Sequence, residues 1–435
     1  MQCPEAFAPT LPIAEACRRS GGRALLVGGA VRDWLMVVEG LWEAGALRPK
    51  DLDLEVHGLA APALERLLRG LGSVSLVGQS FAVYKLTLGP HEIDVSLPRR
   101  DSVRRPGHRG ILAIGDPFMG LTEAARRRDL TINAIAFDPL TGMVEDPWGG
   151  CDDLRAHRLR EVDPDTFGED PLRALRVPQL AARLEFLVTP GLLALCAAMP
   201  LQDLPAERVG GELRKLLMRA SRPSWGLDEG LCAAVWRRLH PALSTLDWEA
   251  ARGAVDRAAD LGCRRWPRGG PRAEALMVGA LLHGVEPAML EGLLDRLDVH
   301  SQGGFALRRA VLLAVQHQRD LPVQASDGAL RLAARMAAPG GGLGLWLSLA
   351  WAVRGDASFA ELLSRTDALG VALGVPPPLV TGRDLVALGF APGPGMGALL
   401  ERLYRRQLEE GLREATPLLA EAAAAATGRG DGRAP

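Results

Sequence analysis

The stretch "KDLDLEV" (residues 50–56) alternates apolar and acidic side chains with the period of two that is typical of a β-strand. Its acidic face carries Asp51, Asp53 and Glu55. Carboxylates this close together repel one another and resist burial, unless a cation neutralises them. Two interpretations follow: a solvated outer face of an edge strand, or a site for divalent metal ions.

The length and charge of the chain limit its architecture and its partners. The chain has 435 residues, which is too long for one compact core and is typical of several domains. Its 51 Lys and Arg nearly balance its 52 Asp and Glu, so nucleic-acid binding would need a local basic surface. Two arginine-dense stretches, residues 104–110 and 125–129, are candidates, and solvated charged loops are the alternative.

Cysteine spacing and hydropathy indicate the compartment. The 6 cysteines are scattered without a C-x-x-C pair, as expected for reduced thiols in a cytoplasmic protein. The N-terminus shows no basic-then-apolar signal segment, and no apolar run is long enough to span a membrane. We therefore expect a cytoplasmic chain with no membrane partner. The oligomeric state stays open.

The pattern of the chain changes at about residue 155. Before it, runs at 23–27, 50–56, 82–88 and 91–97 indicate strands and 61–71 indicates a helix, which favours an α/β domain with a small mixed sheet. After it, apolar residues recur at three- and four-residue spacing, so the remainder is expected to be helical. The final residues lose this pattern, and we expect disorder there.

The segment "RALLVGGAVRDWLM" (residues 23–36) predicts a strand, a tight turn at Gly28 and Gly29, and a helix. Glycines let the backbone approach a ligand, and a helix N-terminus presents free N–H groups to anions. A phosphate cradle is therefore one interpretation, and a purely structural turn is the other. In the first case Arg32, one helical turn later, would face the phosphate.

A second acidic strand, "HEIDVSL" (residues 91–97), places Asp94 on its polar face. Asp51 and Asp53 are two residues apart, roughly 6–7 Å between Cα atoms, so both can converge on Mg²⁺. If the two strands are neighbours, Asp94 completes the set of carboxylates. Because Mg²⁺ takes few protein carboxylates together with substrate phosphates, the combination indicates phosphoryl or nucleotidyl transfer.

Six motifs, in order, resemble those of the class II tRNA nucleotidyltransferase/poly(A) polymerase family. They are "LVGGAVRD", "KDLDLEV", "RRDLTINAIAFDP", "EDPWGGCDDL", "EDPLRALR" and "ERVGGELRKLL", spread over residues 25–217. Residues 381–407 resemble the tail of the CCA-adding members. The resemblance covers most of the chain and is weakest between about residues 220 and 375.

The resemblance implies an α+β fold. An N-terminal, polymerase-β-like nucleotidyltransferase head with a small mixed sheet would precede an all-α neck, body and tail. The expected boundaries are head 1–155, neck 156–225, degenerate body 226–325, tail 326–424 and a disordered end 425–435.

The resemblance also implies roles for single residues. Asp51 and Asp53 would hold the catalytic Mg²⁺, with Asp94 as a third carboxylate. The expected nucleotide-binding residues are Gly28, Gly29, Arg32 and Arg128 at the phosphates, Asp129 and Asn133 at the ribose, and Asp170, Arg173 and Arg176 at the base. A carboxylate accepts from an exocyclic amine and a guanidinium donates to ring nitrogen and carbonyl oxygen, so one Asp/Arg pair can read both CTP and ATP.

The function implied by the resemblance is the addition of CCA to tRNA 3′ ends from CTP and ATP, with release of pyrophosphate and without a template. An A-adding enzyme or a poly(A) polymerase has the same head motifs and is an alternative. A non-catalytic RNA-binding relic is an alternative of another class.

The middle helical region differs from family members that carry a metal-dependent phosphohydrolase domain. Their first His position is Ala250 here, and the position after His283 is Gly284 in place of Asp. A single imidazole cannot hold a centre of two metal ions. We therefore expect a catalytically inactive domain that shapes the protein and helps to cradle tRNA.

Overall fold

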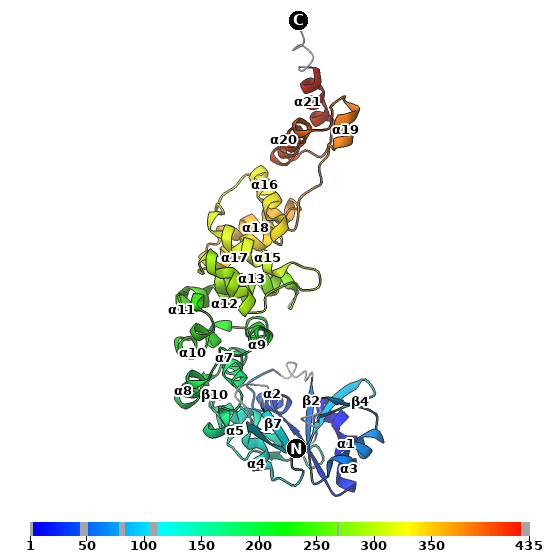
Figure 1. Ribbon diagram of the computed structural model, residues 1–435, viewed down its shortest axis with the longest axis vertical. Coiled ribbons are helices and arrows are strands. Elements are labelled where there is room, and N and C mark those ends of the chain that lie inside the picture. Colours follow the sequence, from blue (N-terminus) through cyan, green and yellow to red (C-terminus); the bar gives the residue numbers. More distant parts are fainter. Residues whose placement is uncertain (1–2, 44–50, 78–82, 104–110, 268, 428–435) are drawn as a thin grey trace. The chain divides into compact units, whose positions relative to one another are not determined.

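The computed structural model describes residues 3–43, 51–77, 83–103, 111–267 and 269–427. The chain divides into two compact units, Met1–Leu216 with Trp225–Ser244, and Leu217–Ser224 with Thr245–Pro435. The named strands all lie in the first unit, and the described part of the second unit is built from helices (Figure 1). The α+β class is confirmed. Residues 225–244, expected at the start of the body, pack with the head and neck.

The head contains a seven-stranded sheet with the order β3-β4-β5-β2-β1-β8-β9. Its strands are β1 (Arg23–Val27), β2 (Leu52–His57), β3 (Ser73–Val77), β4 (Val83–Leu88), β5 (His91–Ser96), β8 (Ala136–Phe137) and β9 (Val144–Glu145). Strands β2 and β5 are parallel and the other pairs are antiparallel, so the sheet is mixed, as predicted.

The four strands predicted from the sequence are confirmed as β1, β2, β4 and β5. The prediction missed β3, whose "SVSLV" sequence is short and rich in serine, and the two-residue strands β8 and β9. It also missed β6 (Arg99–Val103) and β7 (Ile111–Gly115), which pair as a separate two-stranded sheet. Short strands carry too few residues to establish a period.

The helices of the head are α1 (Leu11–Arg19), α2 (Gly29–Val38) and α3 (Ala61–Arg69), after the 3₁₀ turn η1 (Glu5–Thr10). Helices α1 and α3 contact each other, whereas α2 contacts β1 and the 3₁₀ turn η4 (Thr131–Asn133). The rings of Phe7, Trp34 and Phe137 cluster with centroids 4.7–5.9 Å apart. This aromatic cluster fixes α2 against the sheet, and with it the turn at which α2 begins.

The rest of the first unit is mainly helical. It comprises α4 (Leu121–Arg126), α5 (Gly150–Arg155), α6 (Pro164–Phe167), α7 (Leu172–Leu184), α8 (Pro190–Ala198), most of α9 (Ala206–Arg219), α10 (Glu229–Ala234) and α11 (Pro241–Ser244), with the two-residue strands β10 (Arg158–Leu159) and β11 (Leu187–Val188). Eleven residues of α7 are buried, which places this helix in the interior of the unit.

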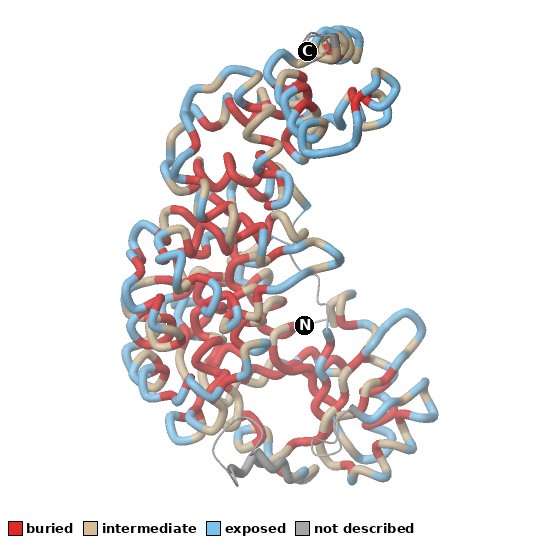
Figure 2. The backbone as a smooth tube through the Cα atoms, turned by 45° about the horizontal axis from the view of Figure 1, so that its top comes forward, coloured by how far each residue is buried: buried red, intermediate tan, exposed pale blue. Residues whose placement is uncertain are grey.

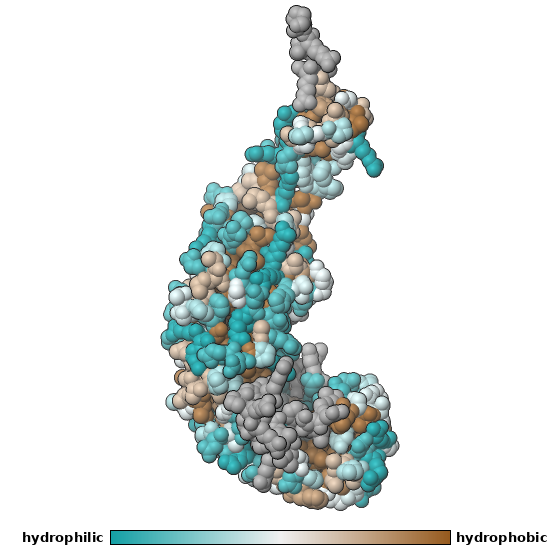
Figure 3. Space-filling view, viewed as in Figure 1, coloured by the Kyte–Doolittle hydropathy of each residue, from teal (hydrophilic) through white to brown (hydrophobic). Residues whose placement is uncertain are grey.

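The second unit contains ten helices in its described residues. They are α12 (Trp248–Arg265), α13 (Pro271–Leu282), α14 (Pro287–Arg296), α15 (Leu307–His317), α16 (Asp327–Ala337), α17 (Leu343–Arg354), α18 (Ser358–Ala368), α19 (Gly382–Ala387), α20 (Pro394–Glu410) and α21 (Thr416–Thr427). Buried backbone runs through the middle of this helical region, and its loops are exposed (Figure 2). The face seen in Figure 3 is mostly hydrophilic, with hydrophobic side chains scattered over it.

The end of the chain differs from its prediction. Disorder was expected from residue 425, but α21 continues to Thr427. Ala425 and Ala426 pack against the apolar cluster that Leu385 and Leu403 form with other residues of the tail. Burial of these alanines stabilises the last helical turn, and residues 428–435 lie outside the described part of the chain.

Within the described residues, no single helix is long and apolar enough to cross a membrane. One bent pair, Asp327–Gly340 with Leu343–Arg354, meets that test by length and composition only, with an angle of 94° between its halves. Nine residues of α17, the second helix of this pair, are buried in the unit, where α17 contacts α12, α13 and α18.

Candidate active site

Asp53 and Asp94 are neighbours across two adjacent strands. Asp53 on β2 is the Cα partner of Asp94 on β5 in a parallel register, so the strands are adjacent, as the proposed carboxylate set requires. On the other side Asp53 pairs with Val27, the last residue of β1. The Gly28 turn therefore begins directly beside the carboxylates, while Asp51 lies exposed just before β2.

The backbone conformation of the Gly28 turn favours glycine. Gly28 has φ +80°, a conformation that L-residues rarely adopt. A Cβ built there would lie 3.7 Å from Asp53 Oδ2 and 3.7 Å from Arg128 Nη1. Carboxylate, guanidinium and turn therefore meet at one point, next to the N-terminus of α2.

The electrostatics of Asp53 fit a cation site. Although Asp53 is open to solvent on one side, burial together with the charges of Asp94 and Asp51 raises its pKa to about 6, and Arg128 opposes this shift. Among the residues that the structure describes, no group of three or more His, Cys, Asp or Glu side chains could hold an ion by itself. Mg²⁺ is commonly bound by one or two carboxylates plus substrate phosphates, so the residues present fit an ion that binds with a triphosphate.

Glu55 corrects the interpretation of the acidic strand face. Its side chain is fully buried, with Oε1 3.2 Å from His57 Nε2, and Oε2 3.4 and 3.5 Å from the guanidiniums of Arg128 and Arg127. Burial alone would raise the pKa of Glu55, but the His57 hydrogen bond and the two arginines lower it to about 2. Neither interpretation of the acidic face, a solvated surface or a metal site, holds for Glu55, because two arginines fold back onto it.

The arginines of the dense stretch 125–129 are paired with carboxylates. In the stretch 125–129, Arg126 pairs with Asp163, and the next two arginines bind Glu55. These charges hold the first unit together. The other stretch, residues 104–110, lies outside the described residues.

The residues expected at the phosphate and the ribose form a continuous hydrogen-bonded chain. Arg32 is 3% exposed and donates from Nη1 to Asn133 Oδ1 at 2.6 Å. Asn133 Nδ2 donates to Asp129 Oδ1 at 2.9 Å, and Asp129 Oδ2 accepts from Arg176 Nε at 2.7 Å. Arg32 lies beneath the turn, with Nη2 3.5 Å from the position of a Cβ on Gly29.

Asp129 is kept ionised by its partners. Burial would raise its pKa, but Arg176, the Asn133 hydrogen bond and Arg173 lower it to about 2. An ionised carboxylate only accepts hydrogen bonds, so this group can take a hydroxyl donor and cannot donate to one.

The residues expected at the base gather at the beginning of α7. Asp170 Oδ1 accepts from the backbone N–H of Leu172 at 3.0 Å. Arg173 is 7% exposed and donates from Nη1 and Nη2 to the carbonyls of Thr166 and Arg127, each at 2.6 Å. The guanidinium has five N–H donors, and these two contacts use only two of them. The other donors could bind a ligand. Base reading by this pair stays a prediction.

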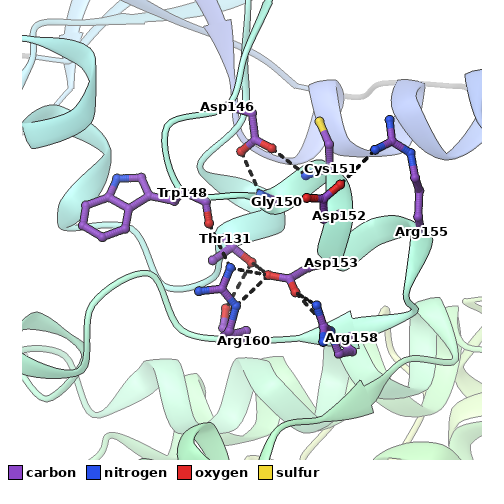
Figure 4. A network of polar contacts seen from close by, with 10 residues as sticks. All are labelled: Thr131, Asp146, Trp148, Gly150, Cys151, Asp152, Asp153, Arg155, Arg158 and Arg160. Carbon is purple, nitrogen blue, oxygen red and sulfur yellow. Dashed lines mark hydrogen bonds and ion pairs between the residues drawn. The ribbon is translucent and has the colours of Figure 1, made fainter.

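The "EDPWGGCDDL" motif supplies a buried network around Asp153, which the sequence reasoning did not assign (Figure 4). Asp153 is 1% exposed and accepts from Thr131 Oγ1 at 2.7 Å. Arg158 Nη2 and Arg160 Nη2 both lie 2.8 Å from its carboxylate. The network holds η4, and therefore Asn133, in place.

The same motif caps α5. The two oxygens of Asp146 accept from the backbone N–H groups of Gly150 at 2.7 Å and Cys151 at 2.8 Å (Figure 4). A Cβ on Gly150 would lie 2.3 Å from the Thr131 carbonyl oxygen, so only glycine fits. The paired glycines and aspartates of the motif indicate close backbone packing. They do not indicate that the segment at Thr131 is the one that packs there.

His283, the histidine that remains at the expected ligand positions, caps the C-terminus of α13. Its Nδ1 lies 2.9 Å from the Ala280 carbonyl oxygen, and burial lowers its pKa. The side chain lines a pocket of about 340 Å³ together with apolar residues and polar or charged ones, among them Glu291, Arg309 and Arg319. Ala250 and Gly284, at the expected ligand positions, carry no metal-binding group.

A mixed sheet that pairs carboxylates on adjacent strands beside a glycine turn at a helix N-terminus defines a nucleotidyltransferase head. Residues 24–160 match the family model of the poly A polymerase head domain. This part of the chain is therefore a poly A polymerase head domain, in agreement with the head motifs of the sequence.

The curated relatives of this chain are named multifunctional CCA proteins. The one from Stenotrophomonas maltophilia is 39% identical over 203 residues, which are 45% of this chain and 46% of that protein. The one from Azoarcus sp. is 41% identical over 204 residues, 46% of this chain and 45% of that protein. The chain thus spans a little under half the length of the curated relatives it matches.

Solved structures share the fold over almost the whole chain. The Thermotoga maritima CCA-adding enzyme complexed with tRNA has a TM-score of 0.65 at 20% identity, covering 96% of this chain and 94% of that one. The Bacillus stearothermophilus CCA-adding enzyme in complex with CTP has a TM-score of 0.61 at 20% identity, covering 98% and 99%. The likeness shows that the helical region, as well as the head, follows a known fold.

Proposed function

We propose that this chain is a tRNA nucleotidyltransferase that adds CCA to tRNA 3′ ends from CTP and ATP, without a template and with release of pyrophosphate. The proposal rests on the register pair of Asp53 and Asp94 beside the Gly28 turn. The names of the relatives favour a tRNA end over other acceptors. We also propose a cytoplasmic location, which a reaction on tRNA favours.

Asp51 and Asp53, with Asp94, would hold Mg²⁺, which in such sites lowers the pKa of an attacking hydroxyl and stabilises charge on the phosphates. The first N–H groups of α2, after Gly28, would bind the triphosphate. Arg128, whose Nη1 is close to the turn, adds a positive charge. Oxygen ligands and phosphate donors thus converge beside β2.

The nucleoside would bind between η4 and the beginning of α7. Asp129 would accept a hydrogen bond from a ribose hydroxyl, and Asn133 would donate one. At the base edge, Asp170 would be the acceptor and Arg173 the donor. In the reaction, the RNA 3′-hydroxyl oxygen forms a bond to the α-phosphorus. The bond from that phosphorus to the bridging oxygen breaks, and pyrophosphate leaves while the hydroxyl proton passes to solvent.

The test uses Mg²⁺ with three tRNA substrates that lack CCA, CA or A, and supplies CTP and ATP separately and together. We expect two additions from CTP on the first substrate, one on the second, and one addition from ATP only on the third. Both nucleotides together should complete all three ends. The Asp53→Asn variant is the inactive control.

Each alternative gives a different product pattern. Incorporation of ATP alone, and only on tRNA lacking the final A, would show an A-adding enzyme. Long homopolymer would show a poly(A) polymerase. Binding of tRNA without any incorporation would show a non-catalytic relic.

A further inference from the structure

Helix α7 reaches the head at two points on one of its faces. Arg176 and Arg183 are seven residues apart, about two helical turns, so they point in similar directions. Arg176 binds Asp129, as described above. Arg183 donates from Nη2 to Asp33 Oδ2 on α2 at 2.5 Å.

Asp33 shares its carboxylate between two arginines. Its Oδ1 accepts from Arg32 Nε at 2.9 Å and from Arg32 Nη2 at 2.6 Å, and its Oδ2 accepts from Arg183. Because Arg32 also donates a hydrogen bond to Asn133, these contacts form a ring that starts and ends on α7. The members of this ring are Arg176, Asp129, Asn133, Arg32, Asp33 and Arg183.

The ring fixes the orientation of groups that face the nucleotide. Arg32 is almost fully buried, and a buried charge needs its counter-ion in place. Its bond to Asn133 Oδ1 leaves the amide nitrogen of Asn133 for Asp129, which sets the orientation of that amide. Opening the ring at Asp33 would therefore loosen Arg32 and, through it, Asn133.

Arg183 also holds the far end of α2. Its guanidinium lies 5.7 Å from the centroid of the Trp42 ring, a cation–π contact. The backbone N–H of Trp42 donates to the carbonyl of Met36, in the last turn of α2. Arg183 thus contacts α2 at its middle, through Asp33, and contacts the segment that follows α2, through Trp42.

We propose that Arg183 is a positioning residue for nucleotide binding. Through Asp33 and Trp42 it fixes α2 relative to α7, and so sets the spacing between the phosphate turn and the base-reading residues. Arg183 would act through these two contacts and not by touching the nucleotide or the metal. This inference rests on the proposed function, because it names how that same site is held in shape.

The test compares Arg183→Ala, Arg183→Lys and the control Arg155→Ala. Arg155 pairs with Glu39 directly after α2, with Nη2 2.9 Å from Oε1, but lies outside the ring. Arg183→Ala should raise the KM for both CTP and ATP about tenfold while kcat changes much less, because binding geometry is lost before chemistry. Arg183→Lys, which keeps the charge beside Asp33, should recover part of the loss.

Amide hydrogen exchange gives a measurement that needs no nucleotide. Arg183→Ala should speed exchange at residues 29–33, and Arg155→Ala should leave it as in the wild type. In a double-mutant cycle, Asp33→Asn with Arg183→Ala should cost little more than Asp33→Asn alone, since Asp33→Asn already weakens the link to Arg183. If Arg183→Ala does not fold, Arg183→Lys and Asp33→Asn carry the same comparison.

The outcomes separate the two proposals. Wild-type protein that neither binds nor incorporates CTP or ATP would overturn the function, while the exchange measurement would still test the ring. An active wild type whose KM and exchange rates were unchanged in Arg183→Ala would overturn the positioning role. Additive losses in the double-mutant cycle would overturn it as well.

Discussion

Asp53 on β2 and Asp94 on β5 are register partners on parallel strands, and no residue separates them across the sheet. The charge of Asp94 is one of the causes that raise the pKa of Asp53. A sheet that served only as a scaffold would gain stability by replacing one of them. Their juxtaposition beside the Gly28 turn is therefore the strongest structural sign of a metal-dependent reaction.

Asp53→Asn should reduce nucleotide incorporation by roughly a hundredfold or more. Even residues that only hydrogen-bond to a metal ligand lower metal affinity or activity about 10–100-fold when they are mutated. The variant should melt no lower than wild type without metal, because a repulsive charge has been removed. Mg²⁺ with CTP should raise the melting temperature of the wild type only. Near-normal turnover in this variant would show that the metal assignment is wrong.

Glu55→Gln should lower the free energy of unfolding by about 3 kcal/mol, because it removes the buried charge that pairs with two half-buried arginines. Denaturant unfolding measures the change. The matched control is Glu65→Gln on α3, whose exposed pair with Arg69 should contribute under about 0.5 kcal/mol. Equal effects of the two substitutions would contradict the buried role of Glu55.

Arg173→Ala should reduce the preference for CTP and ATP over UTP and GTP by about tenfold, the value of one lost hydrogen bond to a charged group. The KM for the triphosphate should change less, because the phosphate contacts lie elsewhere. The control is Arg238→Ala, another arginine that donates to backbone carbonyls, those of Cys196 and Met199, outside the site. It should lose stability and keep its nucleotide preference, and an unchanged preference in Arg173→Ala would refute base reading.

His283 should make stability depend on pH. Burial lowers its pKa, and the charges of Arg319 and Arg257 act in the same direction, while the Ala280 carbonyl and Asp247 oppose them. The unfolded imidazole then binds protons more readily than the folded one, so stability should fall as the pH drops below about 6.5. His283→Gln should lack this contribution to the decrease in the free energy of unfolding. Denaturant-induced unfolding measured between pH 5 and 8 tests this.

The second unit should show no phosphohydrolase activity. We expect no Ni²⁺- or Mn²⁺-dependent hydrolysis of 2′,3′-cyclic AMP or p-nitrophenyl phosphate, because Ala250 and Gly284 replace two of the ligands that such a centre needs. The measurement compares metal-supplemented wild type with His283→Ala. Turnover that disappeared in the variant would show a working centre instead.

Local pattern was sufficient for much of this protein. Alternation with period two marked the central strands β1, β2, β4 and β5, and three- to four-residue spacing marked the helical remainder. The carboxylates and the glycine turn could be found because each motif is short and contiguous. Such features depend on neighbouring residues, which the sequence lists side by side.

Tertiary structure decided which of these groups face a ligand. Asp53 and Glu55 look equivalent on the strand, yet one lies beside Asp94 and the other is buried under arginines some 70 positions later in the chain. The ring through Asp33 and Arg183 joins residues 150 positions apart. No local period encodes such pairs, because they form only where folding brings distant segments together and a buried charge must find its partner.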